Sequence, residues 1–238
     1  MADQAGKAAD LAALDAGIRD CRACPRLVAW REEVAASRRA AFRDQEYWGR
    51  PVPGFGPADA RIGVLGLAPA AHGGNRTGRV FTGDRSGDVL FAALYRAGLA
   101  NQPTSVAVDD GLELRYTRVF ASVRCAPPEN KPSPVERDTC APWLHRELDL
   151  IRPTVRVVVA LGAFAWASWW PVLLSVYGHR PPVPRPTFAH GALAQVAGDT
   201  PALLGSYHVS QQNTFTGRLT PAMLDDIFAR AKQVAGLD

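Results

Sequence analysis

Residues 61–67 read Arg-Ile-Gly-Val-Leu-Gly-Leu and run directly into a glycine-rich segment, residues 68–87. A short apolar run followed by turn residues predicts a buried strand that ends in a loop. A second run of this kind, residues 155–161, is rich in valine and leads into Gly162 and an apolar stretch typical of a helix. Continuously apolar strands are typical of parallel sheets that helices cover on both faces. The two runs therefore predict an α/β fold.

The rest of the chain extends this pattern in both directions. Strands alternating with helices predict βαβ units, and here a three-layer α/β/α sandwich with a mainly parallel four-stranded central sheet in a single domain, residues 1–238. Pro142 is expected to kink or split the helix that contains it. Further strands are predicted at residues 116–124 and 202–207, and helices at residues 8–20, 27–43 and 88–97, from Ser133 and from Thr220.

The composition excludes several classes of protein. Hydrophobic residues make up 47% of the 238 residues and charged residues 21%, which excludes a disordered or fibrous chain. The net charge of +4 is compatible with a polyanionic partner. Residues 157–178 carry no charge and are long enough to span a bilayer, but Gly162 and Pro171 interrupt them. We therefore expect no membrane span, and since the first residues do not resemble a signal peptide, a cytoplasmic location.

The chain has four cysteines, Cys21, Cys24, Cys125 and Cys140. The first two form a C-x-x-C pair, whose spacing lets two thiolates face one metal centre. With no cysteine left over, the fold could bring all four to one site that binds zinc or an iron–sulfur cluster, and the spacing alone does not separate these two. The alternative is a redox-active pair plus two buried structural cysteines.

Three polar or glycine-rich loops, residues 68–87, 125–132 and 208–219, follow predicted strands. In an open parallel sheet, ligands bind where the carboxyl ends of the strands meet, so these loops are the candidate site. The first loop lacks both the Walker pattern and the G-x-G-x-x-G pattern, and a nucleoside triphosphate or dinucleotide site is therefore unsupported.

Three residues of these loops could carry chemistry. Phe81 is an isolated aromatic among small residues, so it could stack on a flat ligand or pack in the core. Asp84 could act as a base or cap the helix that begins near Gly87. His208 directly follows a strand, and the loop behind it could contact phosphates and bases. Five basic residues near the loops are the predicted phosphate contacts: Arg76, Arg79, Arg85, Lys131 and Arg218.

Five segments taken together resemble the uracil-DNA glycosylase superfamily, and within it the family 5 (B-type) branch. They are CRACP (21–25), GLAPAAHGGNRTGRVFTGD (66–84), VRCAPPENKP (123–132), VVVALG (157–162) and HVSQQNTFTGRLTP (208–221). The resemblance implies a DNA repair enzyme that flips uracil out of DNA and hydrolyses its N-glycosidic bond, leaving an abasic site. It also implies a [4Fe-4S] cluster on the four cysteines, which ties the helices within residues 8–43 to the fold. The expected partner is uracil-containing DNA. Double-stranded DNA is the first candidate and single-stranded DNA the second. The protein is expected to be a monomer.

The resemblance also implies roles for single residues. Sister families carry a polar or acidic residue where this chain has Leu67 and Ala68, so Asp84 is expected to orient or deprotonate the attacking water. His208 is expected to donate a hydrogen bond to a carbonyl oxygen of the departing base. Substrate-binding roles are expected for Phe81, Ala68, His72, Asn75 and Arg218.

Many relatives place an asparagine that reads the uracil edge where this chain has Ala121 and Ser122. The change predicts a roomier pocket that also accepts deaminated bases such as hypoxanthine. A non-catalytic iron–sulfur module that binds nucleic acid or carries electrons is the alternative function. Such a module would not need His208, Asp84 and Phe81 at one edge of the sheet, which favours the enzyme.

Overall fold

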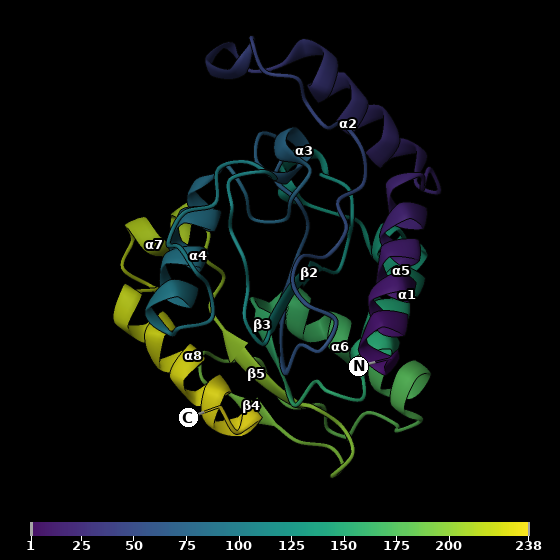
Figure 1. Ribbon diagram of the computed structural model, residues 1–238, viewed down its shortest axis with the longest axis vertical. Coiled ribbons are helices and arrows are strands. Elements are labelled where there is room, and N and C mark those ends of the chain that lie inside the picture. The colour runs from purple at the N-terminus through teal and green to yellow at the C-terminus, as the bar shows by residue number, and fades with distance from the viewer. Residues whose placement is uncertain (1, 238) are drawn as a thin grey trace.

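The computed structural model describes residues 2–237, and within them the strands form one five-stranded sheet in the order β2-β1-β3-β5-β4 (Figure 1). Neighbouring strands are parallel except β4, which is antiparallel to β5. The interior strand β1 places Val64 between Val119 of β2 and Val159 of β3. The strands are β1 (Ile62–Gly66), β2 (Thr117–Ala121), β3 (Val157–Leu161), β4 (Leu193–Ala194) and β5 (Ala202–Ser206).

Helices cover both faces of the sheet. In Figure 1, α4 and α8 lie on one side and α1, α5 and α6 on the other. The α-helices are α1 (Ala2–Arg19), α2 (Pro25–Ser37), α3 (Gly74–Thr77), α4 (Arg85–Arg96), α5 (Pro134–Ile151), α6 (Ala163–Tyr177), α7 (Gln211–Phe215) and α8 (Pro221–Ala235), and Ala40–Phe42 and Pro128–Asn130 are 3₁₀ turns. The predicted three-layer α/β/α architecture is confirmed.

The alternation of side chains along β1 explains its continuous apolar sequence. Ile62 and Val64 belong to the core beneath α4 and α8, whereas Leu65 belongs to the core beneath α5 and α6. All three are fully buried. Because each face of the strand meets a helical layer, neither face can carry polar residues without loss of burial.

The structure differs from the sequence-based prediction in a few elements. The sheet has a fifth strand, β4, whose two residues are too short for a periodic signal. The second helix ends at Ser37 instead of residue 43, because Arg38 takes a positive φ of 51°, which no residue of a right-handed helix adopts. The predicted split at Pro142 is wrong, since α5 is continuous. Pro142 lies on the exposed side of α5, where the carbonyl group that loses its partner can be hydrated.

The uncharged run at residues 157–178 folds as β3 followed by α6. Gly162 separates the two with a φ of 90°, a conformation that glycine adopts without strain. Across the described residues, no helix is both long enough and apolar enough to cross a membrane.

Candidate active site

The loops that follow β1 and β5 meet at the carboxyl edge of the sheet, as the sequence predicts. The rings of Phe81 and His208 lie 6.4 Å apart between centroids and are tilted by 40°. The two short helices of these loops, α3 and α7, both lie in the upper half of Figure 1. Parallel strands therefore bring together side chains that are far apart in the sequence.

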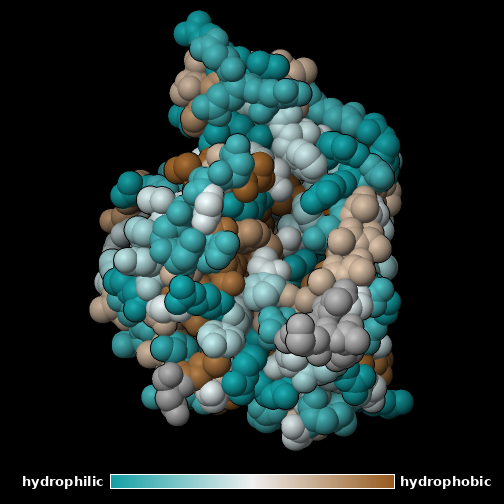
Figure 2. Space-filling model, in the orientation of Figure 1, coloured by the Kyte–Doolittle hydropathy of each residue, from teal (hydrophilic) through white to brown (hydrophobic). Residues whose placement is uncertain are grey.

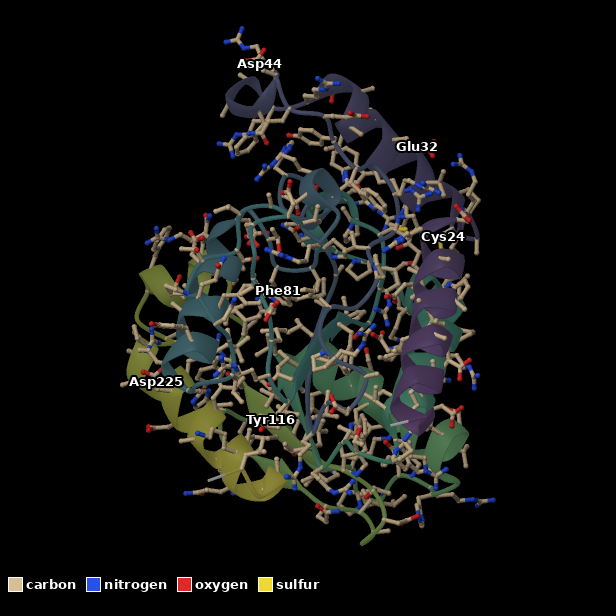
Figure 3. The ribbon with its side chains drawn as sticks, in the orientation of Figure 1. Cys24, Glu32, Asp44, Phe81, Tyr116 and Asp225 are labelled. Atoms are coloured by element: carbon tan, nitrogen blue, oxygen red, sulfur yellow. The ribbon has the colours of Figure 1, made fainter. Side chains whose placement is uncertain are left out.

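Phe81 adopts a left-handed backbone with a φ of 51°. A Cβ atom at Gly66 would lie 2.7 Å from the Phe81 ring, and one at Gly87 would lie 2.0 Å from the Phe81 carbonyl oxygen. Both glycines are therefore required for this placement. Phe81 as a whole is 8% exposed and belongs to the core beneath α4 and α8 (Figure 3). A strained bulky residue of this kind is typical of functional sites.

Asp84 is the N-cap of α4, so the structure confirms its capping role. Its Oδ1 accepts a hydrogen bond from the Gly87 backbone nitrogen at 3.0 Å. Its Oδ2 lies against Gly73, where a Cβ atom would be only 1.9 Å away. Burial raises the pKa of the carboxyl group, against the lowering effect of the backbone hydrogen bonds. One oxygen thus holds the helix while the other faces the glycine-rich loop.

His208 follows β5 and is held from two sides. The side chain of Asn213 donates to the His208 carbonyl oxygen at 2.8 Å, and the absence of a side chain at Gly162 lets His208 approach closely. Burial lowers the pKa of His208 to about 4. The imidazole is therefore neutral near pH 7, with one N–H donor and one acceptor nitrogen.

The other predicted substrate-binding residues are spread over the loops. His72 contacts the Tyr47 hydroxyl through Nδ1 at 3.0 Å, and Arg218 stacks over a tyrosine ring. Asn75 is fully buried and donates to the Arg31 carbonyl oxygen at 3.2 Å, so it ties the glycine-rich loop to α2. Ala68 packs against the apolar residues around the cysteines.

Two of the predicted phosphate contacts are buried, and that prediction is wrong for them. Arg76 donates to the carbonyl oxygens of His72 at 2.8 Å and Gly83 at 2.7 Å. Arg79 forms an ion pair with Asp110 at 2.7 Å. Arg76 thus holds the loop to itself and Arg79 ties it to a neighbouring loop, and neither guanidinium group faces solvent. The predicted contacts that remain exposed are Arg85, Lys131 and Arg218.

The four cysteines line one small cavity of about 20 Å³ between α2, the end of β2 and α5. Cys125 and Cys140 are buried, and burial raises the pKa of their thiols to about 11 and about 12. Figure 3 shows Cys24 near the start of α2. Within residues 2–237, no three His, Cys, Asp or Glu side chains are arranged to hold a single metal ion.

The sequence motifs assign no role to two residues that lie beside the cysteines. Arg31 on α2 and Arg124 after β2 are 2% and 1% exposed. Arg31 shares the buried face of α2 with Leu27, Val28 and Val34. A charged residue at a core-facing position of a helix is the signal that identifies it.

A cavity of about 510 Å³ lies elsewhere, between α1, residues 53–57 and residues 108–114. Phe81, Asp84 and His208 do not line it. Figure 2 shows this face of the molecule as largely hydrophilic, with hydrophobic residues gathered in a hollow between the α1 and α4 sides. The converging loops at the sheet edge, and not this cavity, remain the candidate site.

A parallel sheet with an aromatic ring, a neutral histidine and a carboxylate at its carboxyl edge defines an α/β enzyme of the open-sheet type. The family model described as the uracil DNA glycosylase superfamily matches residues 53–232, and the chain belongs to this superfamily.

Individual relatives show which branch of the superfamily this chain resembles most. The chain is 58% identical to a type-5 uracil-DNA glycosylase of Mycobacterium tuberculosis over 98% of this chain and 85% of that one. It is 54% identical to a type-5 uracil-DNA glycosylase of Thermus thermophilus over 91% and 94%. A type-4 uracil-DNA glycosylase of Thermotoga maritima is 32% identical over only 48% and 51%. The branch indicated by the sequence motifs is thus the one with full-length similarity.

Proposed function

We propose that this protein is a monofunctional uracil-DNA glycosylase that hydrolyses the bond between uracil and deoxyribose and leaves an abasic site. The observation that carries the proposal is the pair of Phe81 and His208 at the sheet edge, in a chain that matches type-5 uracil-DNA glycosylases along nearly its whole length. A base stacked in a duplex is out of reach, so it must rotate out at a cost of a few kcal/mol, which is lowest for a mispair.

Phe81 and His208 receive the flipped base in this proposal. The ring of Phe81 offers a face on which a pyrimidine stacks. Cleavage of the N-glycosidic bond leaves negative charge on the departing base, and fixed hydrogen-bond donors stabilise such charge best in a site that excludes water. The partly buried, neutral imidazole of His208 supplies one such N–H donor to a carbonyl oxygen of the base.

Asp84 activates the water in this proposal. Its capping bond uses one carboxylate oxygen and leaves the other toward the glycine-rich loop. A general base works best when its pKa lies near the working pH, and burial shifts the pKa of Asp84 in that direction. The carboxylate orients a water molecule and accepts its proton as the water oxygen bonds to the sugar carbon.

We further propose that Cys21, Cys24, Cys125 and Cys140 hold a [4Fe-4S] cluster. The donor set fits: four thiols line one cavity, and two N–H groups donate to sulfur, Arg31 Nη1 to Cys125 at 2.9 Å and the Arg124 backbone to Cys140 at 3.3 Å. The bound cluster supplies a cross-link between α2 and α5.

A cleavage assay tests the glycosylase. The protein is incubated with a uracil-containing duplex, treated with alkali and analysed for strand breaks. Asp84→Asn keeps the cap, since asparagine caps helices as well as aspartate does. We expect this variant to fold normally and to lose excision equally for all bases. Full activity of Asp84→Asn would leave Asp84 with the capping role alone. Absence of breaks with the unmodified protein would favour the alternative, a non-catalytic iron–sulfur module.

Metal analysis tests the cofactor. We expect the purified protein to be brown and to contain iron and acid-labile sulfide, whereas Cys125→Ser and Cys140→Ser lose colour and stability together. A colourless protein with one zinc would contradict the cluster.

The proposal also covers the oligomeric state of the enzyme, its location and the form of its DNA substrate. We propose a cytoplasmic monomer that acts on double-stranded DNA, with single-stranded DNA as a second substrate. Size-exclusion chromatography with light scattering checks the monomer, and excision rates on the two forms of DNA rank the substrates.

A further inference from the structure

Two fully buried arginines flank the four cysteines. Arg31 approaches from α2 and donates to Cys125, and Arg124 lies in the segment after β2 and lines the same cavity as the cysteines. Side chains of this charge are almost never fully buried unless an opposite charge pairs with them. We therefore expect negative charge close to both arginines.

Carboxylates balance Arg124 only in part. Its guanidinium contacts Glu147, but Glu147 also contacts Arg118 at 2.6 Å, so two buried cations share one buried anion. Asp15 adds a contact to Arg118 at 3.4 Å and is itself partly exposed. Among the described residues, Nε and Nη1 of Arg124 have no hydrogen-bond partner.

Carboxylates balance the positive charge of Arg31 even less than that of Arg124. Its carboxylate contact is Glu32 at 3.9 Å, and the Glu32 side chain is 45% exposed and also pairs with Arg22. Nη2 of Arg31 donates to the Cys21 carbonyl oxygen, while Nε finds no partner in the described part of the chain. An unpartnered buried N–H group of a charged side chain is costly, so both arginines point to an anion at the cysteines.

We propose that Arg31 and Arg124 are the counter-charges of the iron–sulfur cluster, and that they raise its reduction potential. This inference rests on the cofactor proposed above. A cluster held by four thiolates carries net negative charge, and each one-electron reduction adds one more unit. Buried positive charge and N–H donors to sulfur stabilise the more reduced state, and both are known determinants of cluster potential.

Voltammetry of the cluster-loaded protein on an electrode tests the proposal. We compare the unmodified protein with Arg31→Gln, Arg31→Lys, Arg124→Gln and the control Arg22→Gln. Arg22 lies between Cys21 and Cys24 in sequence, but its side chain is 62% exposed, so water screens its charge. Iron content and thermal unfolding are recorded for every variant, so that a folding defect is distinguished from a change in potential.

We expect the two glutamine variants at buried sites to lower the electron affinity of the cluster about tenfold, which is a shift of about 59 mV to lower potential for one electron. Arg31→Lys and Arg22→Gln should stay near the unmodified value. If Arg31→Gln loses its cluster altogether, retention by Arg31→Lys supports the counter-charge, and loss by both variants contradicts it. Equal potentials in all variants overturn this inference alone, whereas an unmodified protein without iron overturns the cofactor proposal as well.

Discussion

At the scale of single residues, the site depends on glycines as much as on functional groups. The left-handed backbone of Phe81 carries a strain of order 1–3 kcal/mol. Gly66 and Gly87 make that conformation possible, because any side chain at either position would collide with Phe81. A sequence shows the glycines and the aromatic ring but not their contact, since Gly66 ends a strand and Gly87 lies within a helix.

His208→Ala should slow single-turnover excision of uracil by roughly 10²–10³, the usual cost of removing one donor to a developing anion. The loss should be smaller for bases that are better leaving groups, because they need less stabilisation. His179→Ala, which removes an exposed histidine paired with Asp199, is the matched control. An equal loss for all bases would mean that His208 does not act on the leaving group.

The pH dependence of the same step checks the protonation state of His208. Because burial lowers its pKa to about 4, the imidazole stays neutral from about pH 5 to pH 8 and should contribute no titration there. The acid limb of the rate profile should come from Asp84, whose pKa is raised, and should disappear in Asp84→Asn. If the acid limb persists in Asp84→Asn, it comes from the titration of another group.

Ala121→Asn should narrow the substrate range toward uracil. Ala121 lies on the same face of the sheet as Phe81 and offers no polar group, and the hydroxyl of the neighbouring Ser122 is already used to donate to the Gly66 carbonyl oxygen at 3.1 Å. We expect the unmodified enzyme to excise hypoxanthine as well as uracil. Excision rates on duplexes that differ only in carrying uracil or hypoxanthine test both expectations. Strict uracil specificity of the unmodified enzyme would refute them.

At the scale of elements, sequence patterns identify the helix and strand positions but not the partners of charged residues. Arg76, Arg79 and Arg85 look alike within one glycine-rich loop, yet only Arg85 is exposed. The carbonyl groups that Arg76 binds become available only after the loop folds around α3, and Asp110, the partner of Arg79, lies in another loop. The sequence therefore locates the basic loop, but it does not show which of its arginines are exposed.

Asp110→Asn should destabilise the fold by about 3–5 kcal/mol, because it leaves the buried Arg79 without its anion. Burial raises the pKa of Asp110, but the bonds from Arg79 and backbone amides outweigh it and lower the pKa to about 2. The carboxylate therefore contributes its stability above pH 4 and loses it between about pH 4 and pH 2. Chemical unfolding at several pH values measures this, with the exposed neighbour Asp109→Asn as control. Equal acid sensitivity of Asp110→Asn and the unmodified protein would exclude this pair as its source.

At the scale of the whole molecule, the architecture and the place of the site follow from sequence, because both depend on periodicity and on the parallel arrangement of strands. Two buried apolar runs with glycine-rich ends already require helices on both faces and loops at one edge. The sequence also predicts that Cys21, Cys24, Cys125 and Cys140 come together at one site, but it does not predict the buried, incompletely balanced charges of the two arginines beside them. The charge balance of a buried side chain depends on all the elements packed around it, so it cannot be predicted from a local sequence pattern.

DNA binding by the molecule should depend steeply on salt, since neutralised phosphates release counterions. Arg85 and Arg218 are exposed beside the site, each stacked over an aromatic ring, Phe215 and Tyr207. Arg218→Ala and Arg85→Ala should each weaken binding to all sequences alike, and each should reduce the slope of log affinity against log salt by about 0.9. Arg96→Ala is the control, because Arg96 ends the same helix that Arg85 begins, about 16 Å away at 1.5 Å per residue.

Fluorescence anisotropy of a labelled abasic duplex at several salt concentrations measures the slopes without interference from turnover. Because Arg76 and Arg79 are buried in the loop, their substitution should lower thermal stability first and affect the salt slope only through the fold. If Arg96→Ala reduces the slope as much as Arg218→Ala, the positive charge acts through the net charge of the protein and not through a footprint at the sheet edge. If no variant changes the slope, the phosphates contact another face of the molecule, and the glycine-rich loop binds only the flipped nucleotide.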